Sequence, residues 1–322
     1  MNQKRVCICI VLVVLSVLVG CDGGGDEPSV IEYRTGSRAL EVTFLDGFPS
    51  QVYENDDDIR IPVQIENYGA FPQFEELGDL EAFIWVGGYE SSIMQATFDG
   101  GDIRKALDPE ELEGKSAYNL QGGRTIESLI ISIGDLPDGT AVYDPRLIFS
   151  LTYKYRSTAS EEICIDTQPR SVEVRDKVCS LSNFRKSYSV APQGGPVGVT
   201  NVEETVTSAQ TSFKIDIQNL GSGVVIDRAL VSDNPNEGYD WREINKVYVE
   251  DVQVGGRTVD SCRPPLGDPI ELYNGQGNII CTFSHASAGT DEAYITPLTV
   301  KLEYGYKTSD FRNIKILEAI ET

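Results

Sequence analysis

An internal repeat constrains the fold of this chain more than any other feature. Each copy has an alternating apolar segment that ends in Asn-x-Gly and, farther on, a second alternating segment that contains Leu-x-Tyr-x-Tyr. The corresponding landmarks are Asn67, Tyr153 and Ile163 in the first copy and Asn219, Tyr304 and Ile314 in the second. The interval from Asn to Tyr is 86 residues in one copy and 85 in the other, and the interval from Tyr to Ile is ten residues in both. Self-similarity at this spacing predicts a duplicated domain.

Period-two alternation of apolar side chains indicates that both copies consist of β-strands. In the first copy we expect strands at residues 40–45, 59–66, 80–86, 91–98, 126–133, 147–155 and 163–165, with a short helix or two broken turns at 102–112. In the second copy the expected strands include residues 212–219, 298–306 and 314–316. Short strands bounded by turn residues are typical of β-sandwiches. We predict an all-β fold with two tandem immunoglobulin-like β-sandwich domains.

The predicted domains cover residues 39–180 and 196–318. Residues 181–195 are predicted to form a linker between them, because the adjoining segment 191–196 is rich in Gly and Pro. Within the first domain, Pro62 interrupts an alternating segment. Proline lacks an amide hydrogen, so Pro62 predicts an edge strand or a bulge at that point.

Residues 1–20 are predicted to form a lipoprotein signal peptide. Lys4 and Arg5 precede an apolar run of 15 residues, and the lipobox Leu-Val-Gly-Cys ends at Cys21. The run is shorter than the roughly 18 to 20 apolar residues that a membrane-spanning helix needs. We therefore expect lipidation of Cys21 and a glycine-rich, flexible tether at residues 21–38. An uncleaved signal anchor and an unlipidated secreted protein are the alternatives.

The charge of the chain limits its partners. Lys and Arg number 27 against 50 Asp and Glu, and removal of residues 1–20 leaves 25 against 50. Such an acidic surface disfavours nucleic acid and anionic lipid headgroups. We expect no nucleic-acid partner, and we expect the protein on the extracytoplasmic face of the cell membrane, held there by the lipid.

Four cysteines follow the lipobox, namely Cys164, Cys179, Cys262 and Cys281. An even number in an exported chain predicts two disulfides, for which three connectivities are allowed. We expect Cys164–Cys179 and Cys262–Cys281, because each pair is local to one predicted domain. Each closed loop would contribute roughly 3 kcal/mol in the chain-entropy description. A four-thiolate zinc site is the rival, but no Cys-x-x-Cys spacing supports it.

The alternating strand that ends in Asn-x-Gly, preceded by the segment at residues 52–56, resembles CARDB-type and related immunoglobulin-like domains. These domains recur in archaeal and bacterial cell-surface and S-layer-associated proteins. The similarity is one of pattern and extends over residues 40–316, and residues 71–125 depart from it. The resemblance implies a β-sandwich surface protein with a binding or structural role, and it supplies no catalytic residue.

The candidates for catalysis are few. His285 is the only histidine in the chain, and it stands in the segment His-Ala-Ser-Ala-Gly. This segment lacks the leading glycine of a nucleophile elbow and follows a strand in an all-β context. We expect a loop histidine without a catalytic role and a protein that is not an enzyme.

Two acidic turns are the candidates for a metal site. Asp56, Asp57 and Asp58 lie in one turn, and Asp233 and Asp240 lie in the other. Their carboxylates are hard oxygen ligands of the kind that calcium prefers. Neither turn has the spacing of an EF-hand, so plain solvated turns are the alternative, and no other cofactor is expected.

Four tyrosines, Tyr153, Tyr155, Tyr304 and Tyr306, form a stripe on the two Leu-x-Tyr-x-Tyr segments. At period two, both members of each pair point to the same face of a strand. We expect them to pack in the core or at an edge, with stacking on carbohydrate as the alternative.

These features predict a membrane-anchored, extracytoplasmic lipoprotein that serves as a non-enzymatic binding or structural module of the cell envelope. Its partners would be the membrane, through the lipid on Cys21, and an envelope protein or glycan. The alternative function is a carbohydrate-binding or carbohydrate-active accessory protein with calcium-holding acidic loops.

Overall fold

The computed structural model describes residues 32–171, 177–288 and 293–319. Tyr33–Thr322 form one compact unit. Nearly all of its regular structure is β-strand, which confirms the predicted all-β class. The 3₁₀ helices of the described residues are short: η1 (Phe74–Asp79), η2 (Pro109–Leu112), η3 (Ser182–Phe184), η4 (Arg228–Leu230) and η5 (His285–Ser287).

The first copy of the repeat forms a four-stranded antiparallel sheet and part of a second sheet. The four strands are, in spatial order, β1 (Leu40–Phe44), β3 (Ile59–Asn67), β7 (Arg124–Ile133) and β5 (Met94–Phe98). The second sheet receives β6 (Arg104–Ala106), β4 (Ala82–Gly87) and β9 (Arg146–Ile165) from this copy. The sheets pack face to face through apolar side chains, as in the contact of Phe44 on β1 with Phe149 on β9, whose ring centroids lie 4.7 Å apart.

The second copy has the same strand order. Its own sheet contains β10 (Arg185–Ser189), β11 (Val197–Val206), β12 (Gln210–Asn219), β18 (Gln276–Ser284) and β16 (Ser261–Arg263). Opposite lie β15 (Arg257–Thr258), β14 (Lys246–Val254) and β19 (Tyr294–Asn313), with β13 (Val224–Ile226) on β19 and β17 (Pro269–Glu271) on β14. The order β11-β12-β18-β16 thus corresponds to β1-β3-β7-β5, and β15-β14-β19 corresponds to β6-β4-β9.

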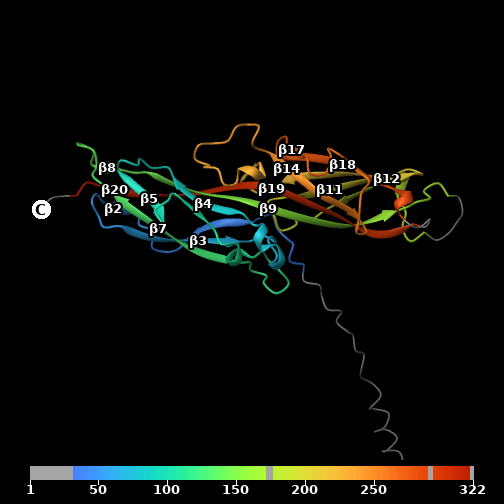
Figure 1. The fold of residues 1–322 in the computed structure, drawn as a ribbon, viewed down its shortest axis with the longest axis horizontal. Coiled ribbons are helices and arrows are strands. Elements are labelled where there is room, and N and C mark those ends of the chain that lie inside the picture. The colour runs from blue at the N-terminus through green and yellow to red at the C-terminus, as the bar shows by residue number, and fades with distance from the viewer. Residues whose placement is uncertain (1–31, 172–176, 289–292, 320–322) are drawn as a thin grey trace, which may run out of the picture. The chain divides into compact units, whose positions relative to one another are not determined.

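The two copies are joined by the pairing of β9 with β19, which run antiparallel along all 20 residues of each strand (Figure 1). The register is self-complementary. Tyr155 lies opposite Tyr304 and Tyr153 lies opposite Tyr306, whereas the repeat makes Tyr153 equivalent to Tyr304 and Tyr155 equivalent to Tyr306. Tyr155 faces the equivalent of Tyr153, and Tyr153 faces the equivalent of Tyr155. Such reciprocal pairing is characteristic of a two-fold axis. The copies therefore associate like the subunits of a symmetric dimer.

Each long strand belongs to both halves of the unit. The first part of β9 pairs with β4, at residues 148–153, and the first part of β19 pairs with β14, at residues 298–304. The remainder of each strand extends the sheet of the other copy. Residues 159, 163 and 165 of β9 are buried, and one continuous apolar cluster extends from Ala39 to Ile316.

The strand ends reach the far end of the opposite half. β20 (Lys315–Leu317) pairs with β2 (Gln51–Tyr53) and β8 (Val142–Tyr143), both from the first copy. The equivalent segment at residues 163–165 is the end of β9, next to Tyr188 of β10. The sequence predicts a separate strand there, but β9 continues through it without a break.

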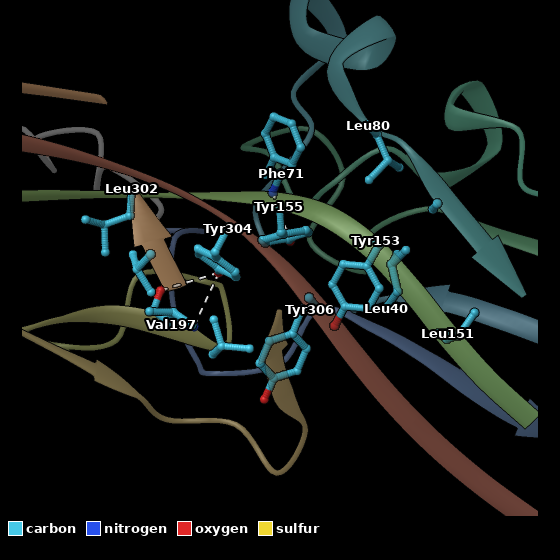
Figure 2. Close-up of a cluster of buried hydrophobic side chains, with 14 of the residues drawn as sticks. Leu40, Phe71, Leu80, Leu151, Tyr153, Tyr155, Val197, Leu302, Tyr304 and Tyr306 are labelled. Carbon is cyan, nitrogen blue, oxygen red and sulfur yellow. Dashed lines mark hydrogen bonds between the residues drawn. The ribbon is translucent and has the colours of Figure 1, made fainter. Parts of the chain in front are cut away.

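The four tyrosines of the stripe meet at the pseudo-two-fold axis (Figure 2). Each has at most 1% of its surface exposed, which confirms packing in the core. Their arrangement repeats the symmetry, because the planes of Tyr153 and Tyr155 and those of Tyr304 and Tyr306 both cross at 74°. The cross-strand pairs are tilted by 47° and 46°. Aromatic pairs at such edge-to-face angles add to the stabilisation that burial gives.

In each copy the Asn-x-Gly turn contacts the second tyrosine of the Leu-x-Tyr-x-Tyr segment. The Tyr155 hydroxyl donates to Asn67 Oδ1 at 3.3 Å and accepts from the Phe71 amide at 3.1 Å. In the second copy, Tyr306 donates to Asn219 Oδ1 at 3.1 Å and accepts from the Gly223 amide at 2.8 Å. A buried tyrosine that bonds a strand-ending turn in this way resembles the tyrosine corner of β-sandwiches.

The glycine–proline segment that suggested a linker lies in the interior. Gln193, Gly194, Gly195 and Pro196 are buried. A Cβ atom on Gly195 would lie 2.8 Å from the Tyr304 hydroxyl and 2.4 Å from Ser157 Oγ. Glycine is required here because the backbone passes close to the tyrosines, so this composition reflects close packing rather than an exposed connection. The predicted domain boundaries at residues 180 and 196 remain a prediction. Because β9 and β19 each extend into both halves, these boundaries divide the sequence but not the sheets.

The remaining differences are local. The segment 102–112, expected as a short helix or two broken turns, forms the strand β6 followed by the short 3₁₀ helix η2, so the strand there was missed. Pro62 lies in β3, a central strand, with no shift of register opposite Ser128. However, β1 pairs only with residues 63–67 of β3. Pro62 is therefore just beyond the end of β1, where β3 is locally an edge.

Replacement of the glycine in either Asn-x-Gly turn should destabilise the whole unit. A Cβ atom would lie 1.9 Å from the Tyr155 hydroxyl in Gly69→Ala and 2.4 Å from the Tyr306 hydroxyl in Gly221→Ala. Overpacking of a buried site costs roughly 1–3 kcal/mol, and we expect a loss of this size in the free energy of unfolding for each variant. Chemical denaturation measures it. Gly78→Ala is the control, because its added methyl group would have no atom within 4 Å, and equal effects of all three changes would contradict the tyrosine contacts.

The shared strands predict that neither copy folds alone. A fragment of residues 196–322 lacks β9 and with it the buried Tyr155 and Ile163. We expect this fragment and residues 33–195 to show no cooperative unfolding separately, and to reassemble when they are co-expressed, since each supplies half a strand to the other. Circular dichroism during thermal unfolding and co-purification measure this. Cooperative unfolding of both isolated fragments would show independent tandem domains instead.

Candidate functional site

The disulfides join the cysteines in the pairs that the sequence predicts: Cys164 to Cys179 and Cys262 to Cys281. The connectivity is confirmed, but the location of the first bond is not within the first half. Cys164 lies near the end of β9, where its amide donates to the hydroxyl of Tyr188 on β10. Cys262 and Cys281 are Cα partners in the pairing of β16 with β18. Both bonds therefore lie in the half built around the second copy, because β9 carries Cys164 across.

A buried carboxyl group lies beside the first disulfide. Glu204 on β11 is fully buried, and its Oε2 accepts a hydrogen bond from Tyr188 at 2.7 Å. Burial disfavours the charged form and raises the pKa of Glu204 to about 7. Nearby, Asp166 is paired with Lys177 at 2.6 Å. The sequence does carry a signal for this burial, since Glu204 occupies an inward position between Val202 and Val206 of an alternating strand.

The acidic turns proposed for calcium use their carboxylates locally. Asp56 accepts from the Tyr53 amide at 2.8 Å, and Asp58 accepts from Ser132 at 2.6 Å. Asp240 accepts from the Arg242 amide at 3.0 Å. The Asp56 and Asp240 bonds close turns, the Asp58 bond joins its turn to β7, and none of them requires a metal.

The structure does not bring these acids into a recognisable metal centre. Within residues 32–171, 177–288 and 293–319 no group of three or more His, Cys, Asp and Glu side chains is arranged to hold a metal ion. Asp57 in the first turn and Asp233 in the second are both exposed. His285 begins the short helix η5, and its Nε2 is 3.0 Å from Thr211 Oγ1.

The proposed lipid site, Cys21, and the signal peptide lie outside the described residues. Among the described residues, no helix is long and apolar enough to cross a membrane.

A groove of about 710 Å³ lies on the outer face of the sheet formed by the second copy. Its floor includes Lys214, Asp216 and Gln218, which alternate on β12 with the buried core residues of that strand. Asn278 of β18 lies beside them, and β17 with the following turn forms a wall that includes Tyr273. The groove therefore combines a polar sheet face with an aromatic side chain.

The turn beside the groove fixes the position of Tyr273. The backbones of Tyr273 and Gln276 exchange two hydrogen bonds, at 2.8 and 3.1 Å, around Asn274 and Gly275. These central residues have φ values of 54° and 78°, as a tight hairpin turn of this length requires. Because Tyr273 directly precedes a closed turn, its backbone is held while 73% of the residue stays exposed.

The charged groups of the groove are already paired. Lys214 Nζ lies 2.8 Å from Asp216 Oδ1, and Asn201 donates to the other Asp216 oxygen at 3.2 Å. The Tyr273 hydroxyl donates to Glu271 Oε2 at 2.8 Å, and this bond raises the pKa of Tyr273. By contrast, the side-chain amides of Gln218, Gln276 and Asn278 make no hydrogen bond to another described residue, so their donors and acceptors are free for a ligand.

The groove was not predicted from the sequence. Two signals were present: an Asn-Gly turn directly after Tyr273, and a polar face on the strand at residues 212–219. Neither identifies a site by itself, because a polar outer face is the ordinary condition of a sandwich strand. The site becomes visible only when the turn is seen to fold over that face.

Comparison of the chain with models of known protein families and with curated proteins finds no match. The similarity to CARDB-type domains therefore remains a resemblance of pattern.

The buried Glu204 should make the stability of the protein depend on pH. Its pKa is raised from the ordinary value near 4.5 to about 7 in the folded state. The folded state therefore retains the proton to higher pH, and stability is lost as pH rises from about 4.5 to 7. At about 1.4 kcal/mol per pKa unit the loss amounts to at most about 3.5 kcal/mol. Urea denaturation at several pH values measures it.

Glu204→Gln should remove this loss and be more stable than the wild type at pH 8. The control is Glu203→Gln, since Glu203 is the neighbouring residue, faces outward and pairs with Arg185 at 3.2 Å. Parallel pH profiles for the wild type and Glu204→Gln would contradict the role of this carboxyl group.

Proposed function

We propose that this protein is a lipid-anchored, extracytoplasmic lipoprotein that displays a β-sandwich binding unit at the cell envelope. The observation that carries the proposal is the pairing of all four cysteines after the lipobox into two disulfides. Structural disulfides form and persist in oxidising compartments, so this pairing supports export. The lipobox that ends at Cys21 supplies the anchor.

The architecture suits display on a membrane surface. β9 and β19 pair along their whole length, so the described residues of the unit Tyr33–Thr322 would be displayed as one body. Disulfides in the half that contains the groove would hold its strands against local opening outside the cell. The immunoglobulin-like character of the sandwiches belongs to this proposal, supported by the strand order and the tyrosine contacts.

The role we propose is binding, without catalysis. The groove offers free amides, paired charges and one exposed ring, a set that can hold a ligand in place. Its charged side chains are paired with neighbours within 3 Å: Lys214 with Asp216, and Glu271 with Tyr273. We therefore propose that these charged groups help to orient a ligand and do not react with it.

Substitution of Cys21 tests the anchor. Two acyl chains on this residue would hold the protein at the membrane, whereas Cys21→Ser has no thiol to accept a lipid. We expect the wild type in the membrane fraction with a lipid-modified N-terminal peptide. We expect Cys21→Ser to lack that modification and its amount in the membrane fraction to fall at least tenfold. Cell fractionation and mass spectrometry measure both. Cys7→Ser is the control, because this residue lies within the predicted signal peptide, and a mature N-terminus other than lipidated Cys21 would refute the anchor.

A further inference from the structure

The groove on the second copy has a composition suited to one class of ligand. Side-chain amides supply both donors and acceptors, and here Gln218, Gln276 and Asn278 present them on one face. A ligand that matches them must carry many hydroxyl groups that both donate and accept. The exposed ring of Tyr273 adds an apolar surface for the C–H face of such a ligand.

The charge of the groove separates it from the rest of the chain. Its lining contains one cation, Lys214, and two carboxylates, Asp216 and Glu271. The protein as a whole carries a formal charge of −23. A cationic peptide would find stronger attraction elsewhere on such a surface, and an anionic polymer would be repelled by it. A neutral ligand is the one that a groove of paired charges and free amides favours.

The geometry is prepared before binding. Tyr273 directly precedes a closed two-residue turn, and the amides project from paired strands, so little backbone order is gained when a ligand binds. Pre-organisation of this kind reduces the entropic cost of binding. The volume of about 710 Å³ lies within the range of ligand pockets in general.

We propose that this groove binds a neutral carbohydrate, with the ring of Tyr273 stacking on a sugar and with Gln218, Gln276 and Asn278 bonding its hydroxyl groups. This inference rests on the proposed display function and names the ligand class that the displayed unit recognises. The occupant is an oligosaccharide segment of a neutral polysaccharide, and a peptide or an anionic glycan is excluded.

The test measures binding of the full chain, in detergent, to soluble neutral glucan, mannan, xylan and galactan, with polygalacturonate as the anionic comparison. We expect the wild type to bind at least one neutral polysaccharide. Tyr273→Ala should weaken this binding about tenfold, equivalent to about 1.4 kcal/mol, and Tyr273→Phe should retain it because the ring remains. Gln276→Ala should weaken it severalfold. Affinity gel electrophoresis and biolayer interferometry give the apparent Kd.

Trp241→Ala is the matched control, since Trp241 is also an exposed aromatic residue, at 69%, and lies outside the groove. Thermal unfolding confirms that each variant is folded. The proposal is overturned if no neutral polysaccharide binds the wild type, if polygalacturonate alone binds, or if Tyr273→Ala and Trp241→Ala have equal effects. Loss of the anchor in Cys21→Ser tests the proposed function separately, so membrane retention of the wild type without polysaccharide binding refutes only the ligand.

Discussion

The pairing of β9 with β19 is the interaction on which the rest of the structure depends. It places rings on one face and ions on the other. On the first face Tyr155 packs against Tyr304 beneath the Asn-x-Gly turns. On the second, the nearly buried Glu303 lies 2.8 Å from Arg156 Nε and 2.7 Å from Arg228 Nη1. A buried carboxylate needs such partners to offset its desolvation, so a slip in register would misplace both the ions and the rings.

The symmetric register also explains the positions of the strand ends and of the Cys164–Cys179 disulfide. In a strand pair centred on a two-fold axis, whatever extends past the centre of one copy must enter the sheet of the other. β20 therefore closes the far end of the first half, and Cys164 carries its disulfide into the second. The two halves cannot separate without exposing apolar residues of both copies, among them Ile163 on β9 and Ile316 on β20, which are buried. The two halves are therefore held together by strands that extend from each copy into the other.

The strands and their equivalence could be predicted from the sequence, because alternation and spacing are local properties. The pairing partners of the strands could not be predicted. The strand that contains Tyr153 has the same alternating pattern whether it pairs within its own copy or with the other copy. The buried Gly195 shows a second limit. From the sequence alone, a glycine required by close packing against a tyrosine cannot be distinguished from a glycine in a linker. The disulfides were predictable because short separations favour local closure. The groove was not, since it depends on a turn folding over a sheet.

Duplication explains why the candidate site occurs once. Asn67 and Asn219 are equivalent, so the residues before them, Glu66 and Gln218, are equivalent too. In the second copy Gln218 lies opposite Gln276, and in the first Glu66 lies opposite Arg124. The same backbone position therefore holds two amides in one half and two charged residues in the other. Framework contacts such as the tyrosine–asparagine bond are kept in both copies because each half needs them to close its turn. The outer face is free of that requirement, so its side chains can diverge without cost to the fold, and the pair of amides beside Tyr273 is one place where the two copies differ.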